Sequence, residues 1–173
     1  EQKGAFHMTQ KDQFTAILHE MTSFYRETPA RVNHFLKVWS FARQIGLSEK
    51  LSDEMQFLLE ITALMHDIGI KPSEEKYHSS AGNYQELEGP VIAAPMLEKY
   101  EFTTAQIDRI CYLIGHHHTY HDIRDLDYQI LVEADFLVNI FEENQSRPAI
   151  ESVREKIFRT TEGLWLLDTL YLS

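Results

Sequence analysis

Apolar residues recur at intervals of three and four residues along almost the whole chain, which is the spacing of one face of an α-helix. Thr28-Pro29 ends the first such segment and begins the second, because Thr28 suits the N-cap and Pro29 the first helical position. Gly46 closes this second helix. The first stripe consists of Phe14, Ile17, Leu18, Met21 and Tyr25, and the second of Val32, Phe35, Leu36 and Trp39.

A third segment is apolar on most of its faces from Phe57 to Ile68, which predicts a central helix capped by Ser52 or Asp53. Beyond it, the polar stretch "KPSEEKYHSSAGNY", at about 71–84, predicts a loop. The letters "EGP" at 88–90 predict another break, before a short helix that Pro95 kinks.

The second half of the chain continues the helical pattern. Thr103 and Gln106 have the spacing of a capping box, for a helix that ends in "GHHHTYH". A polar loop at 119–126 leads to a long helix, "DYQILVEADFLVNIFEEN", and two further helical segments follow at about 148–158 and 161–172. Strand patterns are nearly absent. The pattern therefore predicts an all-α domain of seven or eight helices.

Size and composition fit one domain, with 173 residues, 43% hydrophobic and 25% charged. The single cysteine, Cys111, excludes an internal disulfide framework and a thiolate-rich zinc site. No segment approaches the ~20 apolar residues of a membrane span and the start lacks a secretory pattern, so we expect a cytoplasmic protein without a membrane partner. The formal net charge of −11 argues against nucleic acid as a partner. Residues 1–7 precede Met8 and can be native or a remnant of cloning.

Several polar side chains fall on faces that should be buried. His66-Asp67 ends the apolar third helix, where a polar pair needs partners. Asp135 lies on or beside the apolar stripe of the long helix, and His117 on the core-facing side of its own helix. His34 lies close to the stripe of the second helix. Four helices therefore each direct an imidazole or a carboxylate towards the interior.

Imidazoles and carboxylates without sulfur suit Mn, Fe, Co or Ni better than Zn or Mg. The helix C-terminus at His66-Asp67 favours a cation, because its free carbonyl groups make the local potential negative. A bound divalent cation would also supply the concentrated positive charge that a phosphorylated substrate needs in an acidic protein. Isolated histidines are usually hydrogen-bonded parts of the fold, and we interpret His7, His19, His78 and His121 in this way.

The order of these residues resembles that of the HD-domain superfamily of metal-dependent phosphohydrolases. The resemblance rests on His34 in "RVNHFLKV", His66-Asp67 in "LMHDIG" and Asp135 in "ILVEADFLVN", and it extends over about 28–145. It implies a single-domain helical bundle in which these four residues hold a buried divalent metal ion. In that scheme residues 1–27 form an N-terminal extension and the first helix, and residues 146–173 form helices that pack on the same domain.

Members of this superfamily with two metals add histidines between the His-Asp pair and the last aspartate. His117 matches one such position, with His118 or His116 as its companion, for a second metal or for phosphate. The other position falls near Gln85, where no histidine stands, so one metal site is expected. Some relatives also carry a glutamate or lysine four residues after the motif histidine, and Lys71 lies one residue beyond that position.

The resemblance thus implies hydrolysis of a small phosphorylated molecule, such as a nucleotide, by attack of metal-bound hydroxide on phosphorus. Asp67, His117 and Lys71 are the predicted catalytic residues. Two other functions stay open, namely a di-iron oxygenase of the same fold and a nucleotide-binding sensor without catalysis. The candidates for substrate binding are Arg31, Lys71, Tyr77, His78 and Tyr120.

Overall fold

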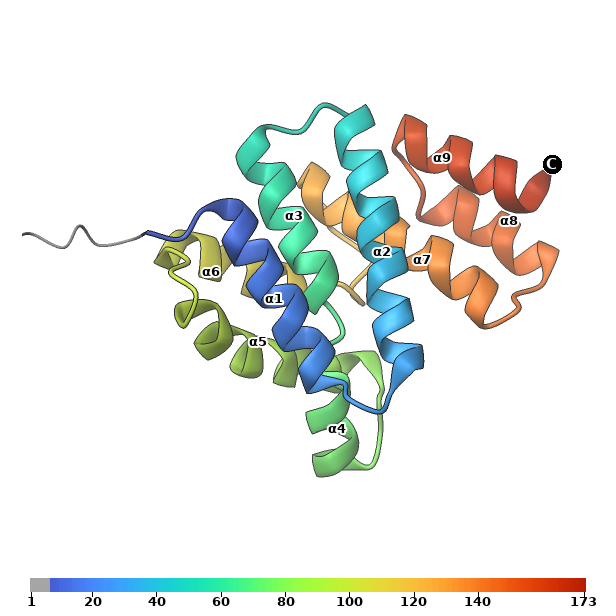
Figure 1. Cartoon of the computed structure of the whole chain (residues 1–173). Coiled ribbons are helices and arrows are strands. Elements are labelled where there is room, and N and C mark those ends of the chain that lie inside the picture. Colours follow the sequence, from blue (N-terminus) through green and yellow to red (C-terminus); the bar gives the residue numbers. More distant parts are fainter. Residues whose placement is uncertain (1–6) are drawn as a thin grey trace, which may run out of the picture.

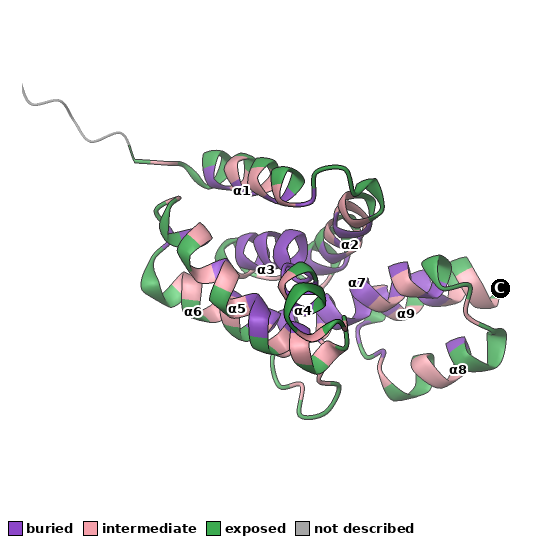
Figure 2. Ribbon diagram, turned by 90° about the horizontal axis from the view of Figure 1, so that it is seen from below, coloured by how far each residue is buried: buried purple, intermediate pink, exposed green. Residues whose placement is uncertain are grey.

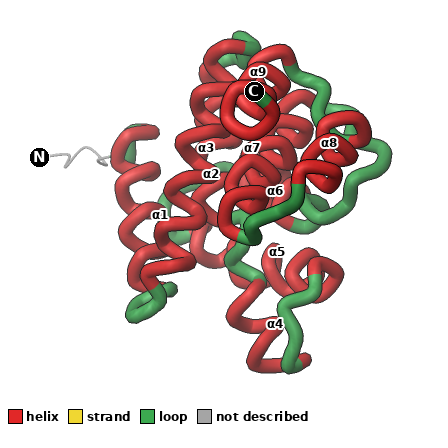
Figure 3. Tube along the Cα trace, turned by 90° about the vertical axis from the view of Figure 1, so that its right-hand side faces the viewer, coloured by secondary structure: helices red, strands yellow, loops and turns green. Residues whose placement is uncertain are grey.

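The computed structural model describes residues 7–173, so residues 1–6, and with them most of the segment of uncertain origin, lie outside the described part. Residues 7–173 form nine α-helices and a final π-helical turn, with no strand (Figure 3). Within these residues no helix is both long enough and apolar enough to cross a membrane. The all-α class predicted from the sequence is confirmed.

The elements follow one another with short connections, and the predicted caps are present: Ser52 accepts a hydrogen bond from the backbone of Met55, and Thr103 and Gln106 form a capping box. In chain order the helices are α1 (Gln10–Phe24), α2 (Pro29–Ser48), α3 (Asp53–Met65), α4 (Ile70–Tyr77), α5 (Gly82–Glu98), α6 (Thr104–Ile114), α7 (Leu126–Glu142), α8 (Arg147–Lys156) and α9 (Thr161–Leu167), followed by the π-helical turn η1 (Asp168–Leu172).

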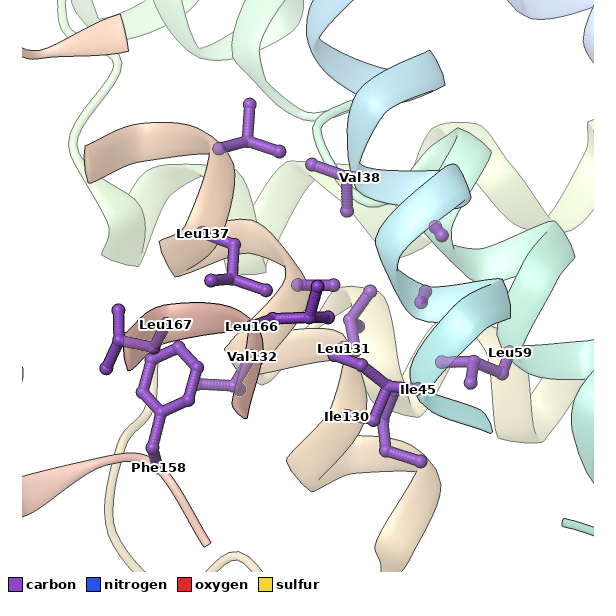
Figure 4. Close-up of a cluster of buried hydrophobic side chains, with 14 of the residues drawn as sticks. Val38, Ile45, Leu59, Ile130, Leu131, Val132, Leu137, Phe158, Leu166 and Leu167 are labelled. Carbon is purple, nitrogen blue, oxygen red and sulfur yellow. The ribbon is translucent and has the colours of Figure 1, made fainter. Parts of the chain in front are cut away.

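Helix α3 lies at the centre of the bundle, as its apolar composition predicts, and it is buried along most of its length (Figures 1 and 2). One hydrophobic cluster joins it to α1, α5 and α6, through residues such as Ile61 and Leu64. A second cluster joins Leu59 of α3 to α2, α7 and α9 (Figure 4). Phe158 and Leu167 belong to this second cluster, so the C-terminal helices pack on the same core.

The prediction of a loop at 71–84 is wrong for its first half, because residues 70–77 form α4. Pro72 lies in the first turn of this helix, where a backbone N–H has no intrahelical partner and its loss costs nothing. Ser73 is buried and donates its hydroxyl proton to the carbonyl O of Gly69 over 2.6 Å. A polar surface and a proline thus mark the start of a helix here. Only about 78–81 remains a loop.

The predicted break at 88–90 is also wrong, because α5 runs through both Pro90 and Pro95. Each proline removes one helical hydrogen bond, and tertiary packing compensates for this loss. A Cβ atom added to Gly89 would clash with Ile114 of α6, and one added to Gly69 would clash with the carbonyl O of Gln85. Helix α5 is therefore held in close contact with α6 and with the turn before α4.

Candidate metal centre

Three helices bring four polar side chains to one buried point. His34 lies on α2, His66 is the C-cap of α3 with Asp67 next to it in the turn, and Asp135 lies on α7. Their exposed fractions are only 6%, 0%, 9% and 4%, respectively. The structure thus brings together the four residues that the sequence predicts as metal ligands.

The atoms that meet are two imidazole nitrogens and the oxygens of two carboxylates. The Nε2 atoms of His34 and His66 lie 3.2 Å apart. Oδ2 of Asp67 lies 3.2 Å from Nε2 of His34, and Oδ1 lies 3.4 Å from Nε2 of His66. Oδ1 of Asp135 lies 3.2 and 3.5 Å from the same two nitrogens. Neighbouring ligands of one metal ion, with bonds of about 2.1 Å, are separated by about 3 Å.

The other nitrogen of each imidazole is already engaged. Nδ1 of His66 donates to the carbonyl O of Ala63 over 2.7 Å, and Nδ1 of His34 donates to the carboxylate of Glu142 over 2.9 Å. A neutral imidazole with its proton on Nδ1 carries a free lone pair on Nε2, which is the atom that a metal binds. Both rings therefore present a ligand atom to the common point.

His117, in the turn after α6, extends the cluster. Its side chain is fully buried, and Nδ1 donates to the carbonyl O of Ile114 over 2.8 Å. Its Nε2 lies 3.4 Å from Oδ1 of Asp67 and has no hydrogen-bond partner among the described residues. A buried nitrogen without a partner costs free energy, and a cation at this point would remove the cost. The residues present therefore fit a divalent metal ion.

The electrostatics of the cluster favour positive charge. Burial lowers the pKa of His34, but Asp135 and Asp67 outweigh it and raise this pKa to about 9. Burial acts to raise the pKa of Asp67, yet His66 and His117 hold it well below its usual range. Two buried carboxylates thus remain charged, and a divalent cation can balance them in place of protons.

Asp67, His117 and His118 form a second group whose ligand atoms lie within 4.8 Å of one another. Nε2 of His118, however, lies 3.1 Å from Oε1 of Gln85, whose amide nitrogen donates to the carbonyl O of Ser80. Because an amide oxygen only accepts, His118 donates from Nε2, and that nitrogen is not free for a metal. Burial, together with His117, lowers the pKa of His118 to about 4, so the ring is neutral. The expectation of one firm metal site stays a prediction, which this arrangement favours.

A cavity of about 460 Å³ opens beside the cluster, and its wall includes His34, Asp67 and Asp135. Arg31, from the first turn of α2, also lines it. Among the predicted substrate-binding residues, Arg31 is the one that the structure places in this wall.

Lys71, Tyr77 and His78 lie outside the wall of this cavity. Nζ of Lys71 lies 5.2 Å from the centre of the Phe24 ring, in a neighbouring groove. The hydroxyl of Tyr77 donates to Glu88 over 2.6 Å. His78 ends α4 in the left-handed conformation, with φ of 53°. The structure does not bring these three side chains to the metal cluster, so their predicted roles have no support from the geometry.

His116 and Tyr120 flank the cluster differently. Nδ1 of His116 donates to the carbonyl O of Tyr112, and the two rings stack, so this imidazole is engaged away from the cluster. The hydroxyl of Tyr120 lies 3.3 Å from Nδ1 of His118, and its ring packs on Phe136. Tyr120 therefore adjoins the cluster through His118.

Sequence reasoning missed three residues that support the ligands. For two of them a signal existed, because they follow Asp135 by four and seven residues and so share its helix face. The third acts through a backbone carbonyl, which no sequence pattern indicates. The contacts are Asn139 with Asp135 (3.0 Å), Glu142 with His34 (2.9 Å) and the hydroxyl of Tyr25 with the carbonyl O of Asp67 (2.6 Å).

A helical bundle that gathers three imidazoles and two carboxylates at a buried point has the architecture of a metal-binding α-helical domain. The model of one family, the HD domain, matches residues 31–157. The chain belongs to this family. The match begins near the predicted start of the core, residue 28, and extends beyond its predicted end at 145 into α8 and the turn that follows it.

Among solved structures, the crystal structure of a predicted HD superfamily hydrolase from an uncultured Thermotogales bacterium is similar to this chain. The TM-score is 0.67 with 22% sequence identity, over 91% of this chain and 84% of that one. At this identity the likeness concerns the fold. No curated protein matches the chain.

Proposed function

We propose that the protein is a metal-dependent hydrolase of small phosphate esters. One observation carries the proposal: buried imidazole and carboxylate groups converge beside an open cavity, and one of their nitrogens, Nε2 of His117, has no partner among the described residues. The similar solved structure is named as a predicted HD superfamily hydrolase, which supports the proposal by analogy.

His34, His66, Asp67 and Asp135 would hold the metal ion. A divalent ion in such a site lowers the pKa of bound water and polarises a phosphoryl oxygen. Oδ2 of Asp67 faces His34, and Oδ1 faces both His66 and His117, so this carboxylate lies within 3.4 Å of all three imidazoles. The guanidinium of Arg31 attracts the phosphate group into the cavity.

The reaction itself is a substitution at phosphorus by water. An oxygen of water bonds to phosphorus, and the bond from phosphorus to the alcohol oxygen breaks. One proton of the water ends on phosphate and the other on the departing alcohol. His118 stays neutral near pH 7, because its pKa is lowered to about 4, so it does not carry a proton to the leaving group.

The two other predicted functions remain untested. Gln85 occupies the place where a second histidine ligand is expected for a di-iron oxygenase, and its amide already accepts from His118. A sensor without catalysis would be expected to lack ligands, whereas the four predicted ones are together here. Anaerobic iron loading followed by exposure to oxygen tests the oxygenase, because a di-iron centre has a visible spectrum.

The proposal is tested with Mn²⁺-loaded protein and two chromogenic probes, p-nitrophenyl phosphate and bis(p-nitrophenyl) phosphate. We expect hydrolysis of at least one probe, and loss of at least about 100-fold in rate in Asp67→Asn and Asp135→Asn. His121→Ala, an exposed histidine in the loop before α7, is the matched control and should retain activity and bound metal. Unchanged turnover in Asp67→Asn, or no hydrolysis with any divalent metal, contradicts the proposal.

A further inference from the structure

The cavity beside the metal cluster has an unusual chemical character for a phosphate site. Of the described residues, Arg31 is the only basic one in its wall apart from the histidines, against four carboxylates: Asp67, Asp135, Glu142 and Glu143. Within residues 7–173, no phenylalanine, tyrosine or tryptophan contributes to the wall. Stacking on an aromatic ring is the usual way in which proteins hold an unpaired base, and polyphosphates need several cations. The cavity therefore suits neither a nucleobase nor a polyphosphate.

Not all four carboxylates remain available to a ligand. Asp67 and Asp135 would be balanced by a divalent ion. Glu142 is balanced by Lys37, whose Nζ lies 2.6 Å away, and it also accepts from His34.

Glu143 differs from these three carboxylates. It lines the cavity at the end of α7, and among residues 7–173 no cationic side chain lies within 4 Å of its carboxylate. Its hydrogen-bond partner is the neutral amide of Gln145, at 2.9 Å. Arg31 does not pair with Glu143 either, because the ion-pair partner of Arg31 in the described residues is Glu74, at 3.6 Å. The contact of Arg31 with Glu74 is long and half-exposed, so solvent screens it and the guanidinium stays available to a phosphate. Glu143 is an exposed carboxylate at the rim of the cavity, with no cation beside it among the described residues.

We propose that the substrate is a phosphate ester of a small amino alcohol. Its phosphate lies at Arg31 and the metal cluster, and its ammonium group lies at the carboxylate of Glu143. The inference rests on the proposed function and names its substrate class. Water adds to phosphorus, the bond from phosphorus to the amino alcohol oxygen breaks, and inorganic phosphate and the free amino alcohol leave.

The test compares two substrates that differ in one group, O-phosphoethanolamine and 2-hydroxyethyl phosphate. We expect kcat/KM to be at least about fivefold higher for the ammonium compound, the size of one partly screened ion pair. Glu143→Gln should lower kcat/KM for the ammonium compound more than for the hydroxyl compound and so remove this preference. Glu155→Gln, an exposed glutamate of α8 outside the cavity, is the matched control and should retain the preference.

Binding provides a second readout that does not depend on turnover. Calorimetry of the Mn²⁺-loaded protein with 3-aminopropylphosphonate and 3-hydroxypropylphosphonate compares the same two groups on ligands that cannot be hydrolysed. We expect tighter binding of the amine in the wild-type protein and equal binding in Glu143→Gln.

The outcomes separate the two proposals. If p-nitrophenyl phosphate is hydrolysed but AMP or ATP is a better substrate than O-phosphoethanolamine, the proposed substrate class is wrong. The proposed hydrolase function is then still supported. If Glu143→Gln changes kcat/KM or affinity equally for the amino and the hydroxyl compound of a pair, the proposed substrate class is also wrong. If no phosphate ester is hydrolysed, the proposed function itself fails, and the substrate class fails with it.

Discussion

Glu142, the last residue of α7, accepts a hydrogen bond from Nδ1 of His34 on α2 across 2.9 Å. The bond keeps the proton on Nδ1 and orients the imidazole, so that Nε2 faces the cluster. We therefore expect Glu142→Ala to weaken the binding of Mn²⁺ by about 10–100-fold, with a smaller effect for Glu142→Gln, whose amide oxygen can still accept the hydrogen bond from Nδ1. Competition with a chromophoric chelator measures the affinity.

The control for this comparison is Glu155→Gln, which removes an exposed carboxylate far from the cluster in the chain. It should bind Mn²⁺ as the wild-type protein does. An unchanged affinity in Glu142→Ala would show that His34 is oriented by its other contacts.

Metal binding should depend on pH through His34. Its pKa is raised to about 9, so the ring is protonated near pH 7 when no metal is bound. A metal ion must displace this proton, and the affinity for Mn²⁺ should therefore rise with pH up to about 9 and level off above that value. Calorimetry in buffers of different ionisation enthalpy counts the released protons. Binding without proton release at neutral pH is the contrary result.

Gln85 should limit the number of bound metal ions. Its amide oxygen accepts from His118, which keeps Nε2 of that ring occupied. Gln85→His replaces the amide by a second imidazole beside Asp67, His117 and His118, and we expect the stoichiometry to rise from one ion to two. Mass spectrometry under native conditions reads this number directly. Two ions in the wild-type protein would show that Gln85 does not block the second site.

Gly69 should be essential for the position of the His-Asp turn. A side chain there would strike the carbonyl O of Gln85, which is backbone and cannot rotate away. We expect Gly69→Ala to lower the free energy of unfolding by about 1–3 kcal/mol, as overpacked sites do. Gly115→Ala is the control, because its nearest contacts are at 3.2 Å and its loss should be smaller. Thermal unfolding of both variants measures these losses. An equal loss of unfolding free energy in the two variants would contradict the prediction.

The helices that could be predicted from the sequence are those with a regular spacing of apolar residues. Helices α1, α2, α3, α6 and α7 each have a clear apolar stripe, and Asp135 stands out as a carboxylate on such a stripe. His34, His66 and Asp67 could be connected to it only through the family pattern, because sequence alone gives no distance between helices. The structure places all four within contact.

Two kinds of feature escaped prediction. The polarity of 71–84 predicts a loop where α4 forms, and "EGP" predicts a break at Pro90, which lies inside α5. The second feature that escaped prediction is the direction in which a side chain points. Successive residues of a helix diverge by about 100°, so Lys71, at the start of α4, lies over Phe24 and not in the cavity. Direction at a helix start depends on the preceding turn, which sequence does not specify.

His34 and Asp135 lie on α2 and α7, which are far apart in the sequence and are brought together by folding. An ion held between them binds the native chain and not the unfolded one, and at a hundred times its dissociation constant it would stabilise the fold by about 2.7 kcal/mol. A cell that runs short of the metal would then lose the polypeptide itself to proteolysis, along with whatever reaction it performs. The supply of the metal would in this way set the amount of the protein in the cell.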